Sequence, residues 1–108
     1  MTRYLSEATL TPQAFAAYIK NPQDRAQVFQ TLYEAVGGKL EAYYFAVGQN
    51  TVYTVSQMPD EIAVEALAIA VMAGGAITSI KATAILTSAE AVAAMKKAGS
   101  IAYKPPTS

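Results

Sequence analysis

Lys81 is the strongest candidate in this chain for a side chain that does chemistry. Lys81 lies inside a long apolar segment, AITSIKATAIL. A partly buried lysine can have a lowered pKa, and it can then act as a base or bind an anion. The simpler interpretation is that Lys81 reaches a sheet edge or pairs with a carboxylate. The sequence leaves both interpretations open.

Tyrosines and one glutamate could complete a site around this lysine. Glu7 belongs to a predicted first strand, and Tyr44 and Tyr53 belong to a predicted hairpin. Together with Lys81 they are our candidate ligand-binding residues, in a conceivable pocket between a sheet and its helices. Further polar lining could come from Thr54, Ser56 and Ser79. The alternative is that the tyrosines fill the core or the seam of a dimer.

Several kinds of chemistry are excluded because the chain has no histidine and no cysteine. Ser-His and Cys-His nucleophile pairs, haem ligation by either residue and the commonest zinc ligands are therefore absent. The acids nearest to one another, Asp60, Glu61 and Glu65, fall in the first turns of a predicted helix. Negative charge there stabilises the helix dipole. We expect no metal site and no cofactor.

The composition favours self-association. The chain has 108 residues, enough for one domain, and only 15% of them are charged, against about 25% in a typical domain. A small domain has too much surface for so few charges unless another copy covers part of it. We expect a homodimer or a higher homo-oligomer.

Other classes of partner lack a signal. The 8 basic and 8 acidic residues balance, and no basic run is present, so we expect no nucleic-acid partner. The opening, MTRYLSEATL, has no long apolar stretch, so we expect no signal peptide there. The most apolar run, VEALAIAVMAGGAI, is shorter than the ~18 residues that a membrane span needs. We expect a cytoplasmic protein with no membrane partner, and a small molecule remains a possible ligand.

Apolar periodicity and helix caps predict the elements. Strands are predicted at residues 2–11, 40–47, 52–58 and 76–87. Helices are predicted at 61–73, with Asp60 as the cap and Gly74-Gly75 as the stop, and from a TSAE capping box to Gly99. Between residues 12 and 36, either two helices abut or one is kinked, with Thr11 as the first cap and the second stretch starting at Pro22. We expect one domain over residues 1–100 and a Pro-rich tail over 101–108.

The resulting order, β-α-β-β-α-β-α, predicts an α+β, ferredoxin-like fold with an extra C-terminal helix. Its four-stranded antiparallel sheet would carry helices on one face only. Strict alternation places Leu40, Ala42 and Tyr44 on one face of the hairpin, and Glu41, Tyr43 and Phe45 on the other. Because both faces are apolar, we expect a second sheet to cover the bare one, as in a dimeric α/β barrel. The candidate interface residues are Tyr43, Phe45, Val52, Ile80, Ile62, Ile69 and Met72.

Three segments carry a family resemblance: KLEAYYFAVG, MPDEIAVEALAIAVMAGGAI and ILTSAEAVAAMKKAGSIAYKPP. From about Gly38 to Pro106 the chain resembles the GYD domain family of short bacterial and archaeal proteins. The resemblance implies a ferredoxin-like fold and a dimeric α/β barrel. It brings no catalytic residue, because the family has no established general activity. The motif that names the family is altered, since Gln49-Asn50-Thr51 follow Gly48 in place of an acidic residue, Tyr and Asp.

Two functions from different classes follow. The first is a non-enzymatic homo-oligomer that binds a small ligand or serves assembly. The second is a cofactor-free enzyme, monooxygenase-like or isomerase-like, in which Lys81 and a tyrosine such as Tyr53 transfer a proton. A cavity in which Lys81 and a tyrosine converge would favour the enzyme.

Overall fold

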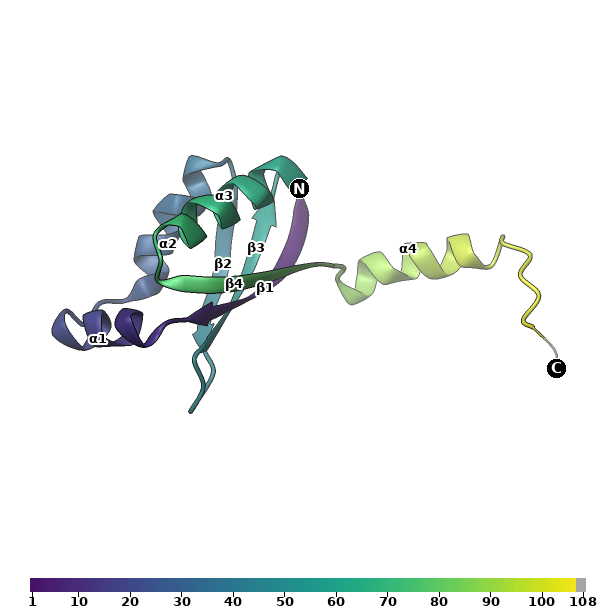
Figure 1. The fold of residues 1–108 in the computed structure, drawn as a ribbon. Coiled ribbons are helices and arrows are strands. Elements are labelled where there is room, and N and C mark those ends of the chain that lie inside the picture. Colours follow the sequence, from purple (N-terminus) through teal and green to yellow (C-terminus); the bar gives the residue numbers. More distant parts are fainter. Residues whose placement is uncertain (107–108) are drawn as a thin grey trace.

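The computed structural model describes residues 1–106, which form one antiparallel sheet and its helices (Figure 1). The elements in chain order are β1 (Thr2–Leu10), α1 (Pro12–Lys20), α2 (Arg25–Ala35), β2 (Lys39–Phe45), β3 (Thr51–Met58), α3 (Glu61–Ala73), β4 (Ile77–Ile85) and α4 (Ser88–Ala98). The strands lie in the order β2-β3-β1-β4. This arrangement confirms the predicted ferredoxin-like α+β fold with an extra C-terminal helix.

The segment between β1 and β2 forms two helices rather than one kinked helix. α1 ends at Lys20, and α2 begins at Arg25. The Asp24 side chain caps α2, because its Oδ1 accepts a hydrogen bond from the N–H of Ala26 at 3.0 Å. The predicted start at Pro22 is therefore wrong by three residues, since Asp24 precedes the first turn instead of lying in it.

An irregularity in β2 decides which hairpin side chains share a face. The pairing with β3 shifts between Leu40 and Ala42, so that Leu40 lies opposite Ser56 whereas Ala42 lies opposite Val55. Glu41 is the extra residue of this bulge. Strict alternation over the hairpin strand is therefore wrong. The face of Leu40 carries Tyr43 and Phe45, and the face of Glu41 carries Ala42 and Tyr44.

The two faces of the sheet differ in cover. Helices α2 and α3 lie over one face, which we call the helix-covered face (Figure 1). The other, which we call the open face, has no helix across it in the described chain. β3 records the difference, because its residues alternate between half-buried and buried along its whole length. The buried ones, on the helix-covered face, are Val52, Thr54, Ser56 and Met58.

The C-terminal part of the chain stands apart from this body. We call residues 86–106 the C-terminal arm; it begins just after β4, which ends at Ile85, two residues before its predicted end. The predicted capping box is present, since Thr87 and Glu90 each bond the other's backbone N–H. α4 nevertheless contains no buried residue and projects away from the sheet (Figure 1).

Candidate functional site

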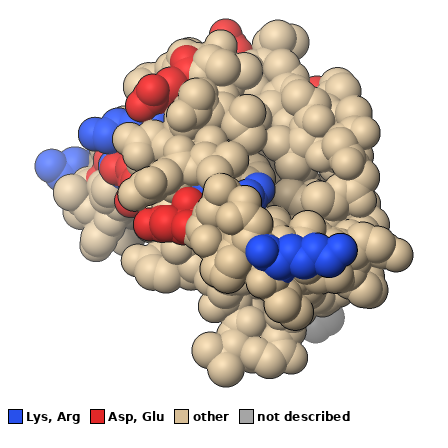
Figure 2. All heavy atoms as spheres, turned by 90° about the vertical axis from the view of Figure 1, so that its left-hand side faces the viewer, with Lys and Arg blue, Asp and Glu red and all other residues tan. Residues whose placement is uncertain are grey.

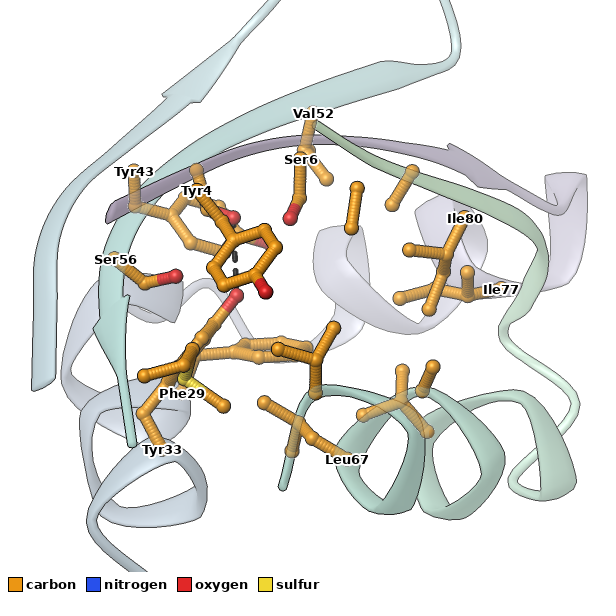
Figure 3. A pocket seen from close by; sticks show the side chains of 17 residues that line it. Tyr4, Ser6, Phe29, Tyr33, Tyr43, Val52, Ser56, Leu67, Ile77 and Ile80 are labelled. Atoms are coloured by element: carbon orange, nitrogen blue, oxygen red, sulfur yellow. Dashed lines mark hydrogen bonds between the residues drawn. The ribbon is translucent and has the colours of Figure 1, made fainter. Parts of the chain in front are cut away.

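A cavity lies between the helix-covered face of the sheet and helices α2 and α3 (Figure 3). β1, β2, β3 and β4 form one wall, and side chains such as Phe29 from α2 and Leu67 from α3 form the other. About 60 Å³ is open to the centre of a water-sized sphere, which is room for roughly four water molecules. Ala82, on the edge strand β4, is the one exposed member of the lining. The cavity therefore reaches the surface near β4.

Hydroxyl groups supply the polar part of the lining. They belong to Tyr4, Ser6, Tyr33, Tyr43, Thr54 and Ser56. Figure 3 shows the side chains of Tyr4, Ser6 and Ser56 directed toward the space between the sheet and α2. The hydroxyls of Tyr33 and Thr54 share a buried hydrogen bond of 3.0 Å, so this pair is already satisfied. All other lining side chains are apolar.

Tyr43 is the unsatisfied member of this group. Its hydroxyl oxygen is buried and has no hydrogen-bond partner within the described chain. Burial raises the pKa of Tyr43 to about 12, so the phenol stays protonated at neutral pH. A buried donor without a partner costs free energy. A ligand that accepts this hydrogen bond would remove that cost.

None of the residues that line the cavity carries a charged side chain. A group that acts as a general base near neutral pH is therefore missing from its wall. An apolar wall with a few hydroxyl donors and acceptors is typical of sites that bind an uncharged molecule or the apolar part of a larger one. The cavity is equipped for binding and orientation.

The four candidate ligand-binding residues come together, but outside this cavity. In the strand register Tyr44 lies opposite Tyr53, Tyr53 lies opposite Glu7, and Glu7 lies opposite Lys81. They form one row across the open face, because they alternate with the cavity-lining residues of their strands. The Lys81 side chain is exposed at the edge strand. Lys81 and a tyrosine therefore do not converge in the cavity.

Of the other polar residues that we placed in the pocket, two lie there. Thr54 and Ser56 line the cavity, whereas Ser79 lies on the open face, where its hydroxyl is 3.3 Å from that of Thr9. Sequence reasoning missed Ser6 and Tyr33 as lining residues. Their signals were present, since Ser6 lies two residues from Tyr4 on one strand and Tyr33 belongs to the apolar stripe of α2.

The candidate interface residues divide into two groups. Val52 is only 2% exposed and belongs to the core. Tyr43 and Ile80 line the cavity, and Phe45 packs edge-on against Tyr18 from α1. Ile62, Ile69 and Met72 of α3 remain exposed, and so does Phe45, which is 45% exposed despite this contact. The open face instead presents Leu5, Tyr44, Tyr53 and Val55. Tyr43, Phe45, Val52 and Ile80 therefore lie on the helix-covered face and not on the open one, where we expected a second sheet.

Two further findings concern the described chain, residues 1–106. No cluster of three acidic residues in it is placed to hold a metal ion. No helix in this range combines the length and apolar character that crossing a bilayer requires.

Comparison with known proteins gives one match. A family model described as GYD domain matches residues 4–96. The match includes β1, α1 and α2, where the resemblance in the sequence is weaker, and it ends within α4. No curated protein and no solved structure matches the chain.

Proposed function

The chain belongs to the GYD domain family, and we propose that it is a non-enzymatic protein that binds a small, largely apolar molecule in the cavity beneath α2 and α3. The observation that carries this proposal is the lining. It combines an apolar wall with several hydroxyls and no charge. One buried phenol, that of Tyr43, has no partner within the described chain.

The size of the cavity fits one ring or a short chain. Its open space corresponds to roughly four waters, which is close to what a single aromatic ring displaces. Each buried CH₂ group contributes about 0.8 kcal/mol to binding. A neutral hydrogen bond from Tyr43 adds about 1 kcal/mol. A ligand of this class would bind with modest affinity and would be oriented by the phenol.

The cofactor-free enzyme is the less favoured alternative. It requires proton transfer by Lys81 with a tyrosine, but Lys81 lies across the sheet from the cavity. The phenol inside the cavity has a pKa raised to about 12 by burial, so it donates a hydrogen bond and does not act as a base at neutral pH. The geometry therefore favours binding over catalysis.

A pair of variants on α3 tests the cavity. Ala68 lines it, and Ala66 lies on the same helix but is exposed and does not line it. Ala68→Phe should fill the cavity and weaken binding of benzyl alcohol at least about tenfold, whereas Ala66→Phe should leave it unchanged, as measured by titration of amide chemical shifts. Equal binding by wild type and both variants would refute the proposed site. Native mass spectrometry of the purified protein would identify any molecule it retains.

The large exposed surface of a single chain supports self-association. Its accessible surface is 7555 Å², whereas a compact monomer of this size exposes roughly 5,800 Å². Its radius of gyration is 17.6 Å, against about 13 Å for a compact domain. The excess surface, roughly 1,800 Å², is within the range of about 1,000–2,500 Å² that each copy contributes to an obligate dimer.

We infer that a second copy of the chain covers this excess. The open face and the C-terminal arm are the regions that lack cover in a single chain. The arm exposes Leu86, Val92, Met95, Ile101 and Tyr103. An ion pair joins the arm to the body, with Arg3 Nη1 3.9 Å from Glu90 Oε1. A surface pair at this distance contributes little to stability. With the open faces packed together, each arm would extend past its own sheet along the partner.

A further inference from the structure

A second recess adjoins the cavity on its outer side, at the end of the molecule formed by α1 and α2. It offers about 240 Å³ to the centre of a water-sized sphere, and α1, α2 and α3 all contribute to its lining. Four apolar residues belong to both the recess and the cavity: Phe29, Leu67, Val71 and Ile77. The two spaces are therefore adjacent and share an apolar wall. Figure 2 views this end of the molecule, where charged side chains are sparse among uncharged ones.

Arg25 is the charged residue of the recess lining. The centre of its guanidinium lies 4.7 Å from the centroid of the Tyr18 ring and 5.9 Å from that of Phe29. These two rings hold the guanidinium by cation–π contacts and limit its orientations. The side chain is thus positioned in advance over an apolar pocket.

The guanidinium lacks an anionic partner in the described chain. Its Nε is buried without a hydrogen bond, and both ion pairs found within residues 1–106 belong to Arg3. The adjacent carboxylate, that of Asp24, instead caps α2 through Ala26. The buried Nε is a donor whose missing partner costs free energy, and a planar carboxylate can accept two hydrogen bonds from a guanidinium.

A second unsatisfied donor lies near Phe29. The rings of Phe29 and Tyr43 are 5.4 Å apart, and the Tyr43 hydroxyl is the buried group without a partner in the cavity. Arg25 and Tyr43 are the two residues whose buried side-chain atoms lack partners within residues 1–106. Both lie against Phe29, which lines both spaces.

We propose that the ligand of this protein is a small organic acid, whose carboxylate pairs with Arg25 in the outer recess and whose apolar body packs along Phe29 into the cavity. This inference rests on the proposed function and adds the chemical class of the ligand. An aromatic or short aliphatic carboxylate satisfies the guanidinium and displaces water from the shared apolar wall. A neutral molecule of the same shape leaves Arg25 without a partner.

Two probes of matched shape test the charge preference. Phenylacetate carries the carboxylate, and 2-phenylethanol replaces it with a neutral hydroxymethyl group. Titration of the full-length protein by isothermal calorimetry or amide chemical shifts should show phenylacetate binding at least about tenfold more tightly, since a hydrogen bond between charged groups is stronger than one to a neutral hydroxyl. Arg25→Met should abolish that preference, because phenylacetate loses the guanidinium that pairs with its carboxylate.

Two further variants serve as controls. Lys39→Met removes the same charge at an exposed position at the start of β2 and should keep the preference for the acid. Arg25→Lys keeps the charge but not the planar fork, and should give an intermediate preference. A dispersed amide spectrum, with wild-type shifts away from the substituted position, shows that each variant is folded.

The outcomes separate this inference from the function on which it rests. Equal binding of both probes by wild type, with no change in Arg25→Met, overturns the acid specificity and leaves the cavity as a binding site. A preference for the acid that survives Arg25→Met also overturns it. Failure of wild type to bind either probe at millimolar concentration overturns both proposals for ligands of this size.

Discussion

The two faces of the single sheet are completed in different ways. On the helix-covered face, alternate residues of β3 are buried by α2 and α3, and the remaining space is a cavity. On the open face, the residues between them stay half-buried, with no helix of the described chain above them. One strand thus serves two environments. The helix-covered face is buried within one chain, whereas the open face would be buried only by the second copy that we propose.

The largest effect should come from the helix-covered face. Met58 is 1% exposed, and Met58→Ala should lower the free energy of unfolding by about 2–5 kcal/mol, because it leaves a hole in the core. Met72→Ala, at a residue that is 37% exposed on α3, makes the same change and should cost less. Urea denaturation measures both. A similar loss in the two variants would contradict the assignment of Met58 to the core.

The second prediction concerns the open face. Val55 lies opposite Leu5 and Ala42 there, and Val55→Lys should weaken self-association at least about tenfold, since a buried, unpaired charge is costly at an interface. Sedimentation velocity over a range of concentrations measures the effect. The control is Val47→Lys, at a position 96% exposed beside the hairpin turn. A wild-type protein that stays monomeric at all concentrations would refute the proposed assembly.

The sequence predicted the elements better than their faces. Caps at Thr11, Asp60 and Thr87, and the glycine after α3, act through neighbouring residues, so local reasoning places these helix ends correctly. The face of a strand residue depends on register instead. A single bulge at Glu41 moved Tyr43 and Phe45 to the face of Leu40. No local signal marked this bulge. The hydrogen-bond partner of Glu41 is Arg3, which is 38 positions away in the sequence.

The candidate site shows the same limit. Lys81 was selected because apolar residues surround it in the sequence. Its neighbours on the same face of the strand, however, are the residues two positions before and after it, which are Ser79 and Thr83. Arg25 attracted no attention because it stands in a polar stretch. Phe29 lies one helical turn from it on α2, but Tyr18 belongs to α1, and only the tertiary fold brings that ring beside Arg25.

The smallest effect separates the two faces by pH. Burial raises the pKa of Tyr43 to about 12, so its phenol keeps its proton in the folded chain at pH values where the unfolded chain has lost it. The folded state then binds more protons than the unfolded state, and stability falls as pH rises from about 10 toward 12. Because Tyr43 is only partly buried, the loss should be modest.

Tyr43→Phe should flatten this part of the stability curve, whereas Tyr44→Phe, on the open face and 63% exposed, should leave it unchanged. Denaturation at several pH values between 9 and 12 measures the slopes, and equal slopes for wild type and Tyr43→Phe would mean that the Tyr43 hydroxyl is not shielded from water. A bound ligand that accepts the hydrogen bond of this phenol would raise its pKa further, so the same titration reports on occupancy of the cavity.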